Sequence, residues 1–387
     1  MKYLAVLGRQ PEISIAELEA LFSDVKQISK SLATFTAESV DINRLGGSIK
    51  IAEELNEKPL DFLQNAPDGK ITIGVSDYSK NASARSAKTE ALKLKQILVR
   101  HGRSVRVVES RDAVLSTATS LHNGLSGKNE RKFELIKLDN DWFRVVGVQD
   151  IDAYTKRDQA RPARDAKVGM LPPKLAQILI NLCGPLPAGS RILDPFCGTG
   201  VVLQEALLMG YTAYGTDLSE KMVDYTKRNL EWLVRGNPEA GKPRTSAPRP
   251  CRRDEATRPE NKPFQVSIGD ATSFQWEQPI DAVACEGYLG APMSQAPAEI
   301  KLKEQKQECG SIILGFLKNL AGQIEPKTPV VIAAPAWLRP NGTYSRLEIV
   351  DEIENMGYNV MNKSREGLLY HRDDQIVARD IIILRKK

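Results

Sequence analysis

Apolar and polar positions in residues 1–150 follow strand and helix periods in turn. Strands are expected at 3–7, 71–75, 105–108, 133–138 and 142–148. A helix with Ser14 as its N-cap is expected after the first strand, and residues 83–101 predict another helix that stops at Gly102. A turn at 65–69 divides this part into 1–65 and 66–150. The pattern predicts a small α+β module.

From residue 175 onward, strands alternate regularly with helices. Helices are expected at 175–182, 201–209 and 220–233. Strands are expected at 192–193, 212–215, 266–268, 280–285 and 330–334. Residues 367–372 and 377–384 predict a closing antiparallel hairpin. Such alternation predicts an α/β domain over 175–387, built on a doubly wound, mostly parallel sheet.

Two segments lack these periods. Residues 151–174 are mixed in charge and are expected to connect the two parts. Residues 236–262 hold five prolines, seven basic and four acidic residues, with almost no large apolar side chain. Because such a segment buries too little surface to offset its ordering entropy, we expect a disordered insertion. A phosphate-binding arm and a tolerated surface loop both remain open for it.

Composition places the chain among ordinary globular proteins. Its 387 residues are 41% hydrophobic and 27% charged, which excludes wholesale disorder. No apolar run is long enough to span a bilayer, so we expect a cytoplasmic protein. The five cysteines form no Cys-x-x-Cys pair and lie far from the three histidines, so we expect reduced thiols and no metal site.

Positive charge is concentrated in one segment. Residues 80–111 hold nine basic residues against two acidic ones, an excess of seven where the whole chain has +5. This asymmetry favours a polyanionic partner, although a solvated helix face explains it equally well. Lys88, Lys95 and Arg106 would lie off the buried stripe of the predicted helix, open to solvent or phosphate.

The sharpest motif is Asp-Pro-Phe-Cys-Gly-Thr-Gly at 194–200. A buried strand is expected to end at Asp194, and a helix to begin at Val201. Gly198 and Gly200 would form a turn where the backbone approaches a ligand closely, with the free N–H groups of the helix pointing at it. The Gly-x-Gly-x-x-Gly spacing of dinucleotide-binding enzymes is absent.

Acidic residues follow the next two predicted strands. Asp217 is placed to accept both hydroxyls of a ribose, which suits NAD and S-adenosylmethionine (SAM) sites alike. Asp270, with a neighbouring backbone N–H, suits an adenine edge. Each acid alone is more often a turn former, but acids at successive strand ends after a glycine turn indicate a ligand site.

The 194–200 motif resembles the SAM-binding loop of class I methyltransferases that modify exocyclic amines. The wider string, from Tyr154-Thr-Lys-Arg-Asp through Met170-Leu-Pro-Pro-Lys-Leu-Ala to that loop, resembles the THUMP-containing tRNA guanosine-N2 methyltransferases that act at position ten. The resemblance is good over 150–235 and 264–385 and looser before them. It implies a Rossmann-like domain, with a ferredoxin-like subdomain at 1–65 and an RNA-binding THUMP-like domain at 66–150.

The resemblance also implies roles for individual residues. The loop would hold the methionine part of SAM. Asp217 would bind the ribose, and Asp270 would bind the adenine. The expected cofactor-binding residues are Asp194, Pro195, Phe196, Gly198, Thr199, Gly200, Asp217, Leu218, Asp270 and Ala271. The basic segment falls where the THUMP domain should be, which favours tRNA as the polyanionic partner. Eukaryotic relatives use a small accessory protein, and nothing in the sequence shows whether this chain needs one.

The chain departs from the family at the catalytic motif. Amine methyltransferases usually carry Asp/Asn-Pro-Pro-Tyr, whereas this chain has Glu286-Gly-Tyr288. An exocyclic amine needs a polar acceptor for its N–H and an aromatic wall for the base, and Glu286 and Tyr288 can supply them. However, Glu reaches one methylene further than Asp, and Gly287 lacks the stiffness of proline, so preorganisation is in question.

Three explanations of this departure stay open: a variant with the same chemistry, a changed target base or position, and loss of activity. The best-supported function is SAM-dependent methylation of the N2 amine of a tRNA guanosine. The competitors are a DNA N6-adenine or N4-cytosine methyltransferase and an inactive RNA-binding relative.

Three arginines lie in the connector: Arg157, Arg161 and Arg164. The resemblance puts this segment near the mouth of the active site, which predicts phosphate contacts. A salt-bridge network with Asp158 and Asp165 competes with that interpretation.

Overall fold

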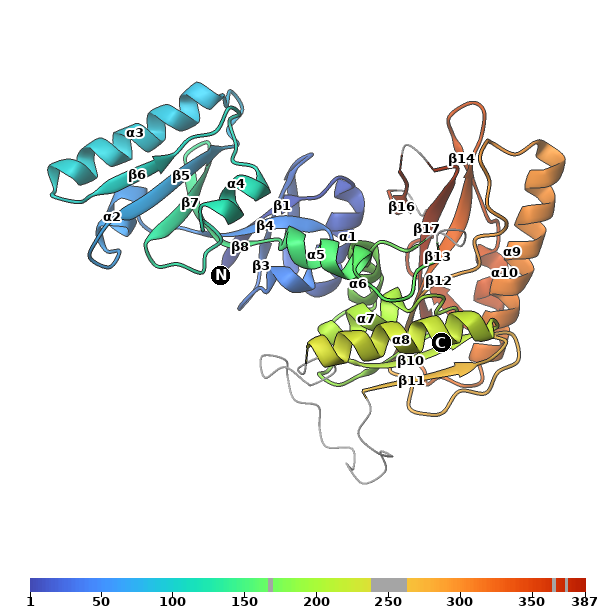
Figure 1. Cartoon of the computed structure of the whole chain (residues 1–387). Coiled ribbons are helices and arrows are strands. Elements are labelled where there is room, and N and C mark those ends of the chain that lie inside the picture. Colours follow the sequence, from blue (N-terminus) through green and yellow to red (C-terminus); the bar gives the residue numbers. More distant parts are fainter. Residues whose placement is uncertain (166–169, 238–262, 364–366, 373–374) are drawn as a thin grey trace. The chain divides into compact units, whose positions relative to one another are not determined.

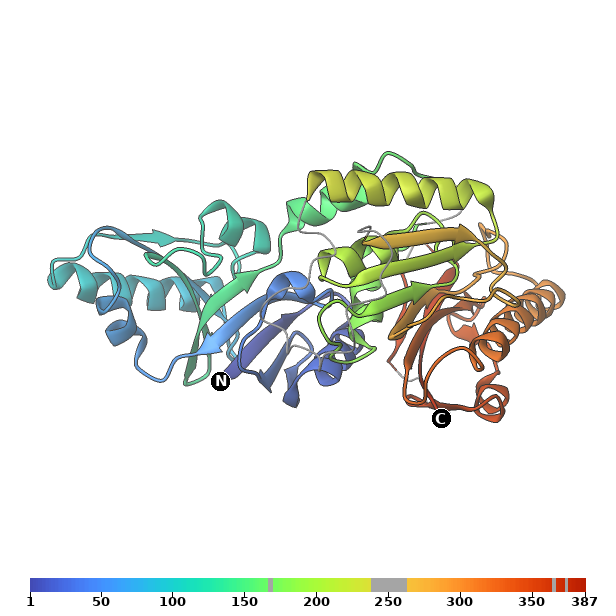
Figure 2. The same cartoon turned by 90° about the horizontal axis from the view of Figure 1, so that it is seen from below.

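The computed structural model describes residues 1–165, 170–237, 263–363, 367–372 and 375–387. It divides the chain into two compact units, Met1–Tyr154 and Thr155–Lys387. Almost all of the insertion expected at 236–262 lies outside the described residues. Each unit is built on a sheet of its own (Figures 1 and 2).

The first unit contains one eight-stranded sheet in the order β2-β3-β1-β4-β8-β7-β5-β6. The strands are β1 (Lys2–Leu7), β2 (Ser23–Ser29), β3 (Leu32–Thr36), β4 (Ser48–Glu54), β5 (Ile71–Asp77), β6 (Val105–Val108), β7 (Lys132–Leu138) and β8 (Asp141–Val148). Strand β8 pairs with β4 on one side and with β7 on the other. Segments 1–65 and 66–150 therefore share a continuous sheet.

The helices of this unit are α1 (Pro11–Leu21), α2 (Pro59–Gln64), α3 (Ala84–Arg100), α4 (Thr117–His122) and the 3₁₀ turn η1 (Ile42–Arg44). Helix α3 follows the predicted pattern closely. Ser83 caps it by accepting a hydrogen bond from the backbone N–H of Ser86, and the Ser86 hydroxyl accepts one from the backbone N–H of Ser83. Its buried stripe is Ala87, Ala91, Leu94 and Leu98. The charged side chains of the helix consequently lie on its other faces.

Ser14 is not the N-cap that the sequence predicted. Helix α1 already begins at Pro11, where the missing N–H costs nothing. Ser14 instead lies inside the helix, buried, and its hydroxyl donates to the carbonyl of Gly47 at 2.7 Å. Glu17, also buried, accepts from the backbone N–H groups of Gly46 and Gly47. The helix thus uses its polar residues to hold a neighbouring loop.

The interior of the first unit contains an ion pair. Lys50 on β4 and Glu134 on β7 lie 2.6 Å apart, with 1% and 0% of their side chains exposed. Ser76 and Ser120 donate to the Glu134 carboxylate, and Lys50 also donates to the carbonyl of Leu115. A buried pair is tolerated when its remaining hydrogen bonds are made, and these partners make them.

The second unit contains a nine-stranded sheet whose main path runs β11-β10-β9-β12-β13-β17-β15, with β14 beside β13 and β16 beside β17. The strands are β9 (Arg191–Asp194), β10 (Thr212–Asp217), β11 (Phe264–Ile268), β12 (Ala282–Glu286), β13 (Pro329–Leu338), β14 (Tyr344–Arg346), β15 (Tyr358–Val360), β16 (Leu369–Tyr370) and β17 (Val377–Lys386). Strands β9 to β13 are parallel, and β17 is antiparallel to β13. The predicted mostly parallel α/β sheet is confirmed.

Helices cover both faces of this sheet: α6 (Pro173–Asn181), α7 (Val201–Leu208), α8 (Glu220–Gly236), α9 (Glu299–Leu320) and α10 (Val350–Asn355). Successive side chains of β10 point to opposite faces of the sheet and pack against different helices. Ala213 packs with residues of α7 and α8, whereas the next residue, Tyr214, belongs to the cluster that includes α9. Figures 1 and 2 show α8 and α9 on opposite sides of the strands. The domain is therefore a three-layer α/β/α structure.

The expected connector is more regular than its sequence suggested. Helix α5 covers Ile151–Gln159, and α6 begins at Pro173. Only one residue of α5, Tyr154, is buried, so apolar periodicity gave little signal for it.

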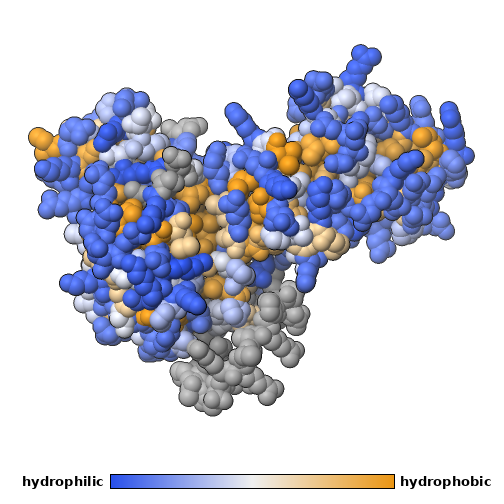
Figure 3. Space-filling model, turned by 180° about the vertical axis from the view of Figure 1, so that it is seen from behind, coloured by the Kyte–Doolittle hydropathy of each residue, from blue (hydrophilic) through white to orange (hydrophobic). Residues whose placement is uncertain are grey.

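No helix among the described residues is long and apolar enough to cross a membrane. On the face drawn in Figure 3, apolar side chains lie interspersed among hydrophilic ones.

Candidate active site

The glycine turn links β9 to α7 as the sequence predicted. Gly198 and Gly200 have φ values of +52° and +84°, in the region that favours glycine. Gly200 caps α7, and a Cβ atom there would lie 2.9 Å from Cγ2 of Thr226. A Cβ atom at Gly198 would meet only the carbonyl oxygen of Phe196, at 3.9 Å, so a ligand has room to approach the backbone there.

Asp217, at the end of β10, is part of this turn. Its Oδ2 accepts from the backbone N–H of Gly198 at 2.9 Å, and its Oδ1 accepts from that of Ser219. Thr226 fixes the other side by donating to the carbonyl of Gly198 at 2.7 Å. Since a carboxylate has about four acceptor positions, Asp217 can still accept hydroxyl groups.

Asp194 is the most buried acid of the site. Only 2% of it is exposed, and Oδ1 accepts from the backbone N–H of Phe196 at 3.1 Å. Burial raises its pKa well above the usual value, and the negative charges of Asp217 and Glu286 raise it further. Three carboxylates from three strand ends thus converge, which suits a ligand that carries positive charge.

Apolar side chains lie beside these acids at the ends of β10 and β11. Leu218 is 73% exposed and Ile268 is 51% exposed, both unusual for large apolar residues. Asp270 is exposed next to them, and hydrogen bonds from the hydroxyl and backbone N–H of Thr272 lower its pKa. Ala271 is buried. This combination offers an apolar surface edged by an ionised acceptor.

Glu286 is the last residue of β12 and lies at the same edge. Its Oε1 accepts from Nε of Arg379 on β17 at 2.8 Å, with 18% of the Glu286 side chain and 6% of the Arg379 side chain exposed. Tyr288 is 37% exposed and donates its hydroxyl to Glu308 at 3.1 Å. The ring is thereby anchored at one end while much of its surface stays open.

Helix α9 holds the loop after β12. Gly290 has a φ of +83°, and the next N–H, of Ala291, donates to Gln305 at 2.9 Å. Gln305 in turn donates to Glu308, the partner of Tyr288. The sequence analysis missed this helix and its role. Buried Leu302, Gln305, Cys309 and Ile313 recur at helical spacing, which is the signal that would have revealed it.

Two of the three connector arginines do not point to solvent. Arg157 donates to the buried Glu205 of α7 at 2.7 Å. Burial raises the pKa of Glu205 to about 7, and the Arg157 guanidinium limits that rise. Arg161 is 4% exposed and approaches Asp158 at 3.6 Å, with Nη1 3.5 Å from the hydroxyl of Thr199.

The expectation of phosphate contacts for Arg157 and Arg161 is therefore wrong for this structure, because both fasten the connector to the domain. Arg164 is exposed and donates to the carbonyl of Gln159. Its expected contact with phosphate stays a prediction.

Asn229 of α8 joins the connector to the glycine turn. Its Nδ2 donates to the carbonyls of Ala163 and Thr199, both at 2.9 Å, and its Oδ1 accepts from the N–H of Ala163. The residue is fully buried. A single amide thus satisfies three backbone groups of two segments that are far apart in sequence.

The predicted RNA-binding residues of the first unit lie on α3 and β6. Lys88 and Arg106 are exposed, and Lys95 is half-buried. Lys88 pairs with the exposed Glu109 at 2.7 Å, and Arg106 donates to Asn123. Exposed pairs of this kind are weak, so they leave the side chains able to exchange partners.

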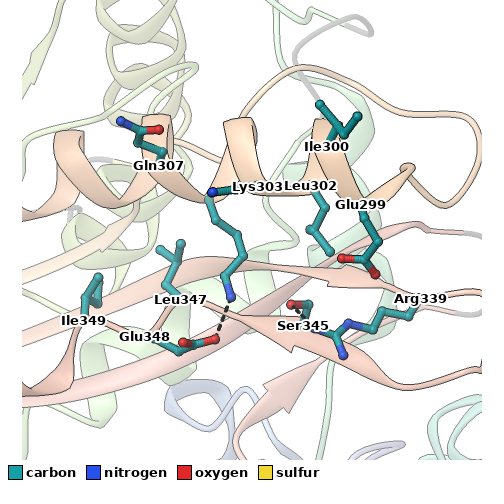
Figure 4. A pocket seen from close by; sticks show the side chains of 11 residues that line it. Glu299, Ile300, Leu302, Lys303, Gln307, Arg339, Ser345, Leu347, Glu348 and Ile349 are labelled. Carbon is teal, nitrogen blue, oxygen red and sulfur yellow. Dashed lines mark hydrogen bonds and ion pairs between the residues drawn. The ribbon is translucent and has the colours of Figure 1, made fainter.

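A groove of about 680 Å³ lies between the start of α9 and β14 in the second unit (Figure 4). Lys306 pairs with Glu348 across it at 2.7 Å, and Arg339 donates to Ser345. None of the residues expected to bind a cofactor lines this groove. In the part of the chain that the structure describes, no cluster of His, Cys, Asp or Glu side chains is arranged to hold a metal ion.

The fold and the site define a class of protein. Acidic side chains and a glycine turn at the carboxyl edge of a doubly wound sheet are typical of domains that bind a nucleoside-containing ligand. Residues 161–242 match the family described as the RMKL-like methyltransferase domain, UPF0020. This part of the chain is therefore similar to a methyltransferase domain.

Curated relatives give the comparison more detail, and three of them are named tRNA (guanine(10)-N2)-dimethyltransferase. That of Methanothermobacter thermautotrophicus is 41% identical over 112 residues, which span 28% of this chain and 33% of the relative. Those of Methanocaldococcus jannaschii and Pyrococcus abyssi are 26% and 29% identical over 244 residues, spanning 69% and 68% of their lengths. These relatives confirm the family resemblance seen in the motifs.

Among solved structures, TrmN from Thermus thermophilus aligns over the whole chain with 16% identity and a TM-score of 0.46. A magnesium protoporphyrin IX methyltransferase from Synechocystis with bound SAM aligns over 55% of this chain, with a TM-score of 0.32.

Replacing Asn229 with alanine should destabilise the second unit. Asn229→Ala leaves buried backbone groups of Ala163 and Thr199 unpaired, and we expect the free energy of unfolding to fall by about 2–4 kcal/mol. Denaturant unfolding followed by circular dichroism measures it. Arg228→Ala, on the same helix but exposed, is the control. Equal losses for the two variants would contradict the bridging role of the amide.

Proposed function

We propose that the chain methylates the N2 amine of a guanosine in tRNA with SAM as the methyl donor. The observation that carries this proposal is the place of Glu286: an acceptor at the end of β12, at the same sheet edge as the glycine turn and Asp217. The names of the relatives add the substrate and point to position ten.

The site residues suit SAM on physical grounds. When bound, SAM supplies a methyl group activated by a sulfonium. Asp194, Pro195, Phe196 and the turn at 198–200 would hold its methionine part, and the converging carboxylates favour its positive charge. Asp217 would accept the ribose hydroxyls. Leu218, Ile268 and Ala271 would pack on the adenine, with Asp270 at its amine edge.

Glu286 and Tyr288 would act on the guanine. The lone pair of an exocyclic amine is delocalised into the ring, so an acceptor for the N–H favours the nucleophilic geometry. Within the described residues, Oε2 of Glu286 has no hydrogen-bond partner, and it would accept that N–H and then the proton released. Tyr288 would support the flipped base with its open ring face.

The first unit would hold the RNA. We assign residues 1–65 to a ferredoxin-like subdomain and 66–150 to a THUMP-like domain, whose exposed lysines and arginines on α3 and β6 would contact phosphates. The connector at 151–174 would carry one further contact, through Arg164.

The reaction is tested by incubating the protein with SAM and tRNA and identifying nucleosides by mass spectrometry. We expect N2-methylated guanosine, and Glu286→Gln should lower turnover by about 10²-fold or more because the acceptor loses its charge. Glu304→Gln, an exposed acid on α9, is the control. Product in duplex DNA alone would indicate a DNA methyltransferase, and tRNA binding without product an inactive relative; either result overturns the proposal.

The cofactor site is tested by Asp217→Ala. Two charge-assisted hydrogen bonds to ribose would be lost, so we expect calorimetry to show SAM affinity reduced ten- to hundred-fold, or about 1.5–3 kcal/mol. Asp224→Ala removes an exposed acid of α8 that pairs with Arg228, and it should leave the affinity unchanged. Full affinity in Asp217→Ala would show that the ribose lies elsewhere.

RNA binding is tested by changing Lys88, Lys95 and Arg106 together to glutamine. We expect weaker tRNA binding, with the slope of log affinity against log salt reduced by about 2–3 as three phosphate contacts disappear. The matched control changes Lys26, Lys30 and Lys70, which are exposed on the same unit outside the basic segment. If both triple variants lose affinity equally, the basic segment is not the specific contact.

A further inference from the structure

Arg379 is an almost fully buried arginine that no sequence motif revealed. It lies on β17 and donates through Nε to Oε1 of Glu286 at 2.8 Å. Its Nη1 donates to Gln375 at 2.7 Å and to the carbonyl of Val377 at 3.3 Å. The guanidinium is therefore held by Gln375, just before β17, and by Val377, at the start of β17, as well as by the carboxylate. A group held at several points can orient its partner.

The sheet register explains how the two residues meet. Glu286 of β12 is paired with Ala333 of β13, and Arg379 of β17 with Pro335. Residues 333 and 335 are two apart on one strand, so they point to the same face as Glu286 and Arg379. Both are small, and the arginine side chain has room to cross β13 above them. The contact spans 93 positions in sequence.

Glu286 needs such a partner because its own loop does not hold it. Gly287 follows directly, and a Cβ atom there would make only ordinary contacts of 3.4 Å with Ile313 and Ile332. The glycine N–H donates to Ala333, which fixes the backbone but not the carboxylate. A second acid, Asp194 at the end of β9, interacts electrostatically with Glu286. Without Arg379, the acid would have a flexible side chain and a repelling neighbour.

We propose that Arg379 is the positioning residue of the active site, which holds Oε1 of Glu286 so that Oε2 faces the target amine. This inference rests on the proposed methyl transfer. In this chain an arginine on β17 would restrain the catalytic carboxylate, as a proline in the catalytic loop would otherwise do. The arginine contacts neither the base nor the methyl donor and acts through the carboxylate alone.

The test compares Arg379→Gln, Arg379→Lys and Arg385→Gln. Arg385 is a half-buried arginine of the same strand that donates to the carbonyl of Cys183, so its loss measures damage to β17 alone. We expect Arg379→Gln to lower kcat about 10- to 100-fold, since misplacement by about 1 Å has that effect. The KM for SAM and the calorimetric affinity for S-adenosylhomocysteine should stay within two-fold of wild type.

Rescue by a conservative variant separates positioning from stability. Arg379→Lys keeps the positive charge beside Glu286 but loses the planar guanidinium that also donates to Gln375 and to the carbonyl of Val377. We therefore expect kcat to recover only in part in Arg379→Lys, while the KM for SAM stays that of wild type.

A crystal structure of Arg379→Gln gives a readout that does not depend on activity. We expect the Glu286 side chain in more than one rotamer, or turned away from its wild-type position. A single unchanged rotamer, or an unchanged kcat, would overturn the positioning role. If wild type itself transfers no methyl group to tRNA, the proposed function fails, and the Glu286 rotamers still decide whether Arg379 holds the carboxylate.

Discussion

Parallel pairing of β9 with β10 and β12 is the constraint on which the site depends. Because these strands run in one direction, their last residues, Asp194, Asp217 and Glu286, meet at one edge of the sheet. Carboxylates placed this close together repel one another. The backbone N–H groups of Phe196 and Gly198 and the guanidinium of Arg379 offset part of the repulsion.

The parts that sequence predicted well are those determined by short-range patterns. The turn at 198–200 has the positive φ values that only glycine adopts easily, and α3 ends where Gly102 follows. The parallel sheet followed from strands alternating with helices. Ser14 was assigned wrongly because a serine near a helix start resembles an N-cap, although Pro11 already began the helix.

The parts that sequence could not give depend on long-range register. The pairing of Glu286 with Arg379 requires β12, β13 and β17 to be aligned, and no local pattern contains that alignment. The prediction of phosphate contacts in the connector was wrong for a related reason. Arginines near the expected mouth of the active site suggested phosphate, whereas Arg157 forms an ion pair with the buried Glu205 of α7. A basic residue reveals its partner only when the acids near it are known.

The position of β17 has a consequence for the order of assembly. This strand lies between β13 and β15, brings Arg379 to Glu286 across β13, and follows β9 to β13 in the chain. A nascent chain that has folded β9 to β13 would already have its glycine turn and acids in place, yet Glu286 would be unrestrained. Pairing of β17 with β13 is therefore the step that restrains the Glu286 carboxylate, and it comes after the glycine turn has formed.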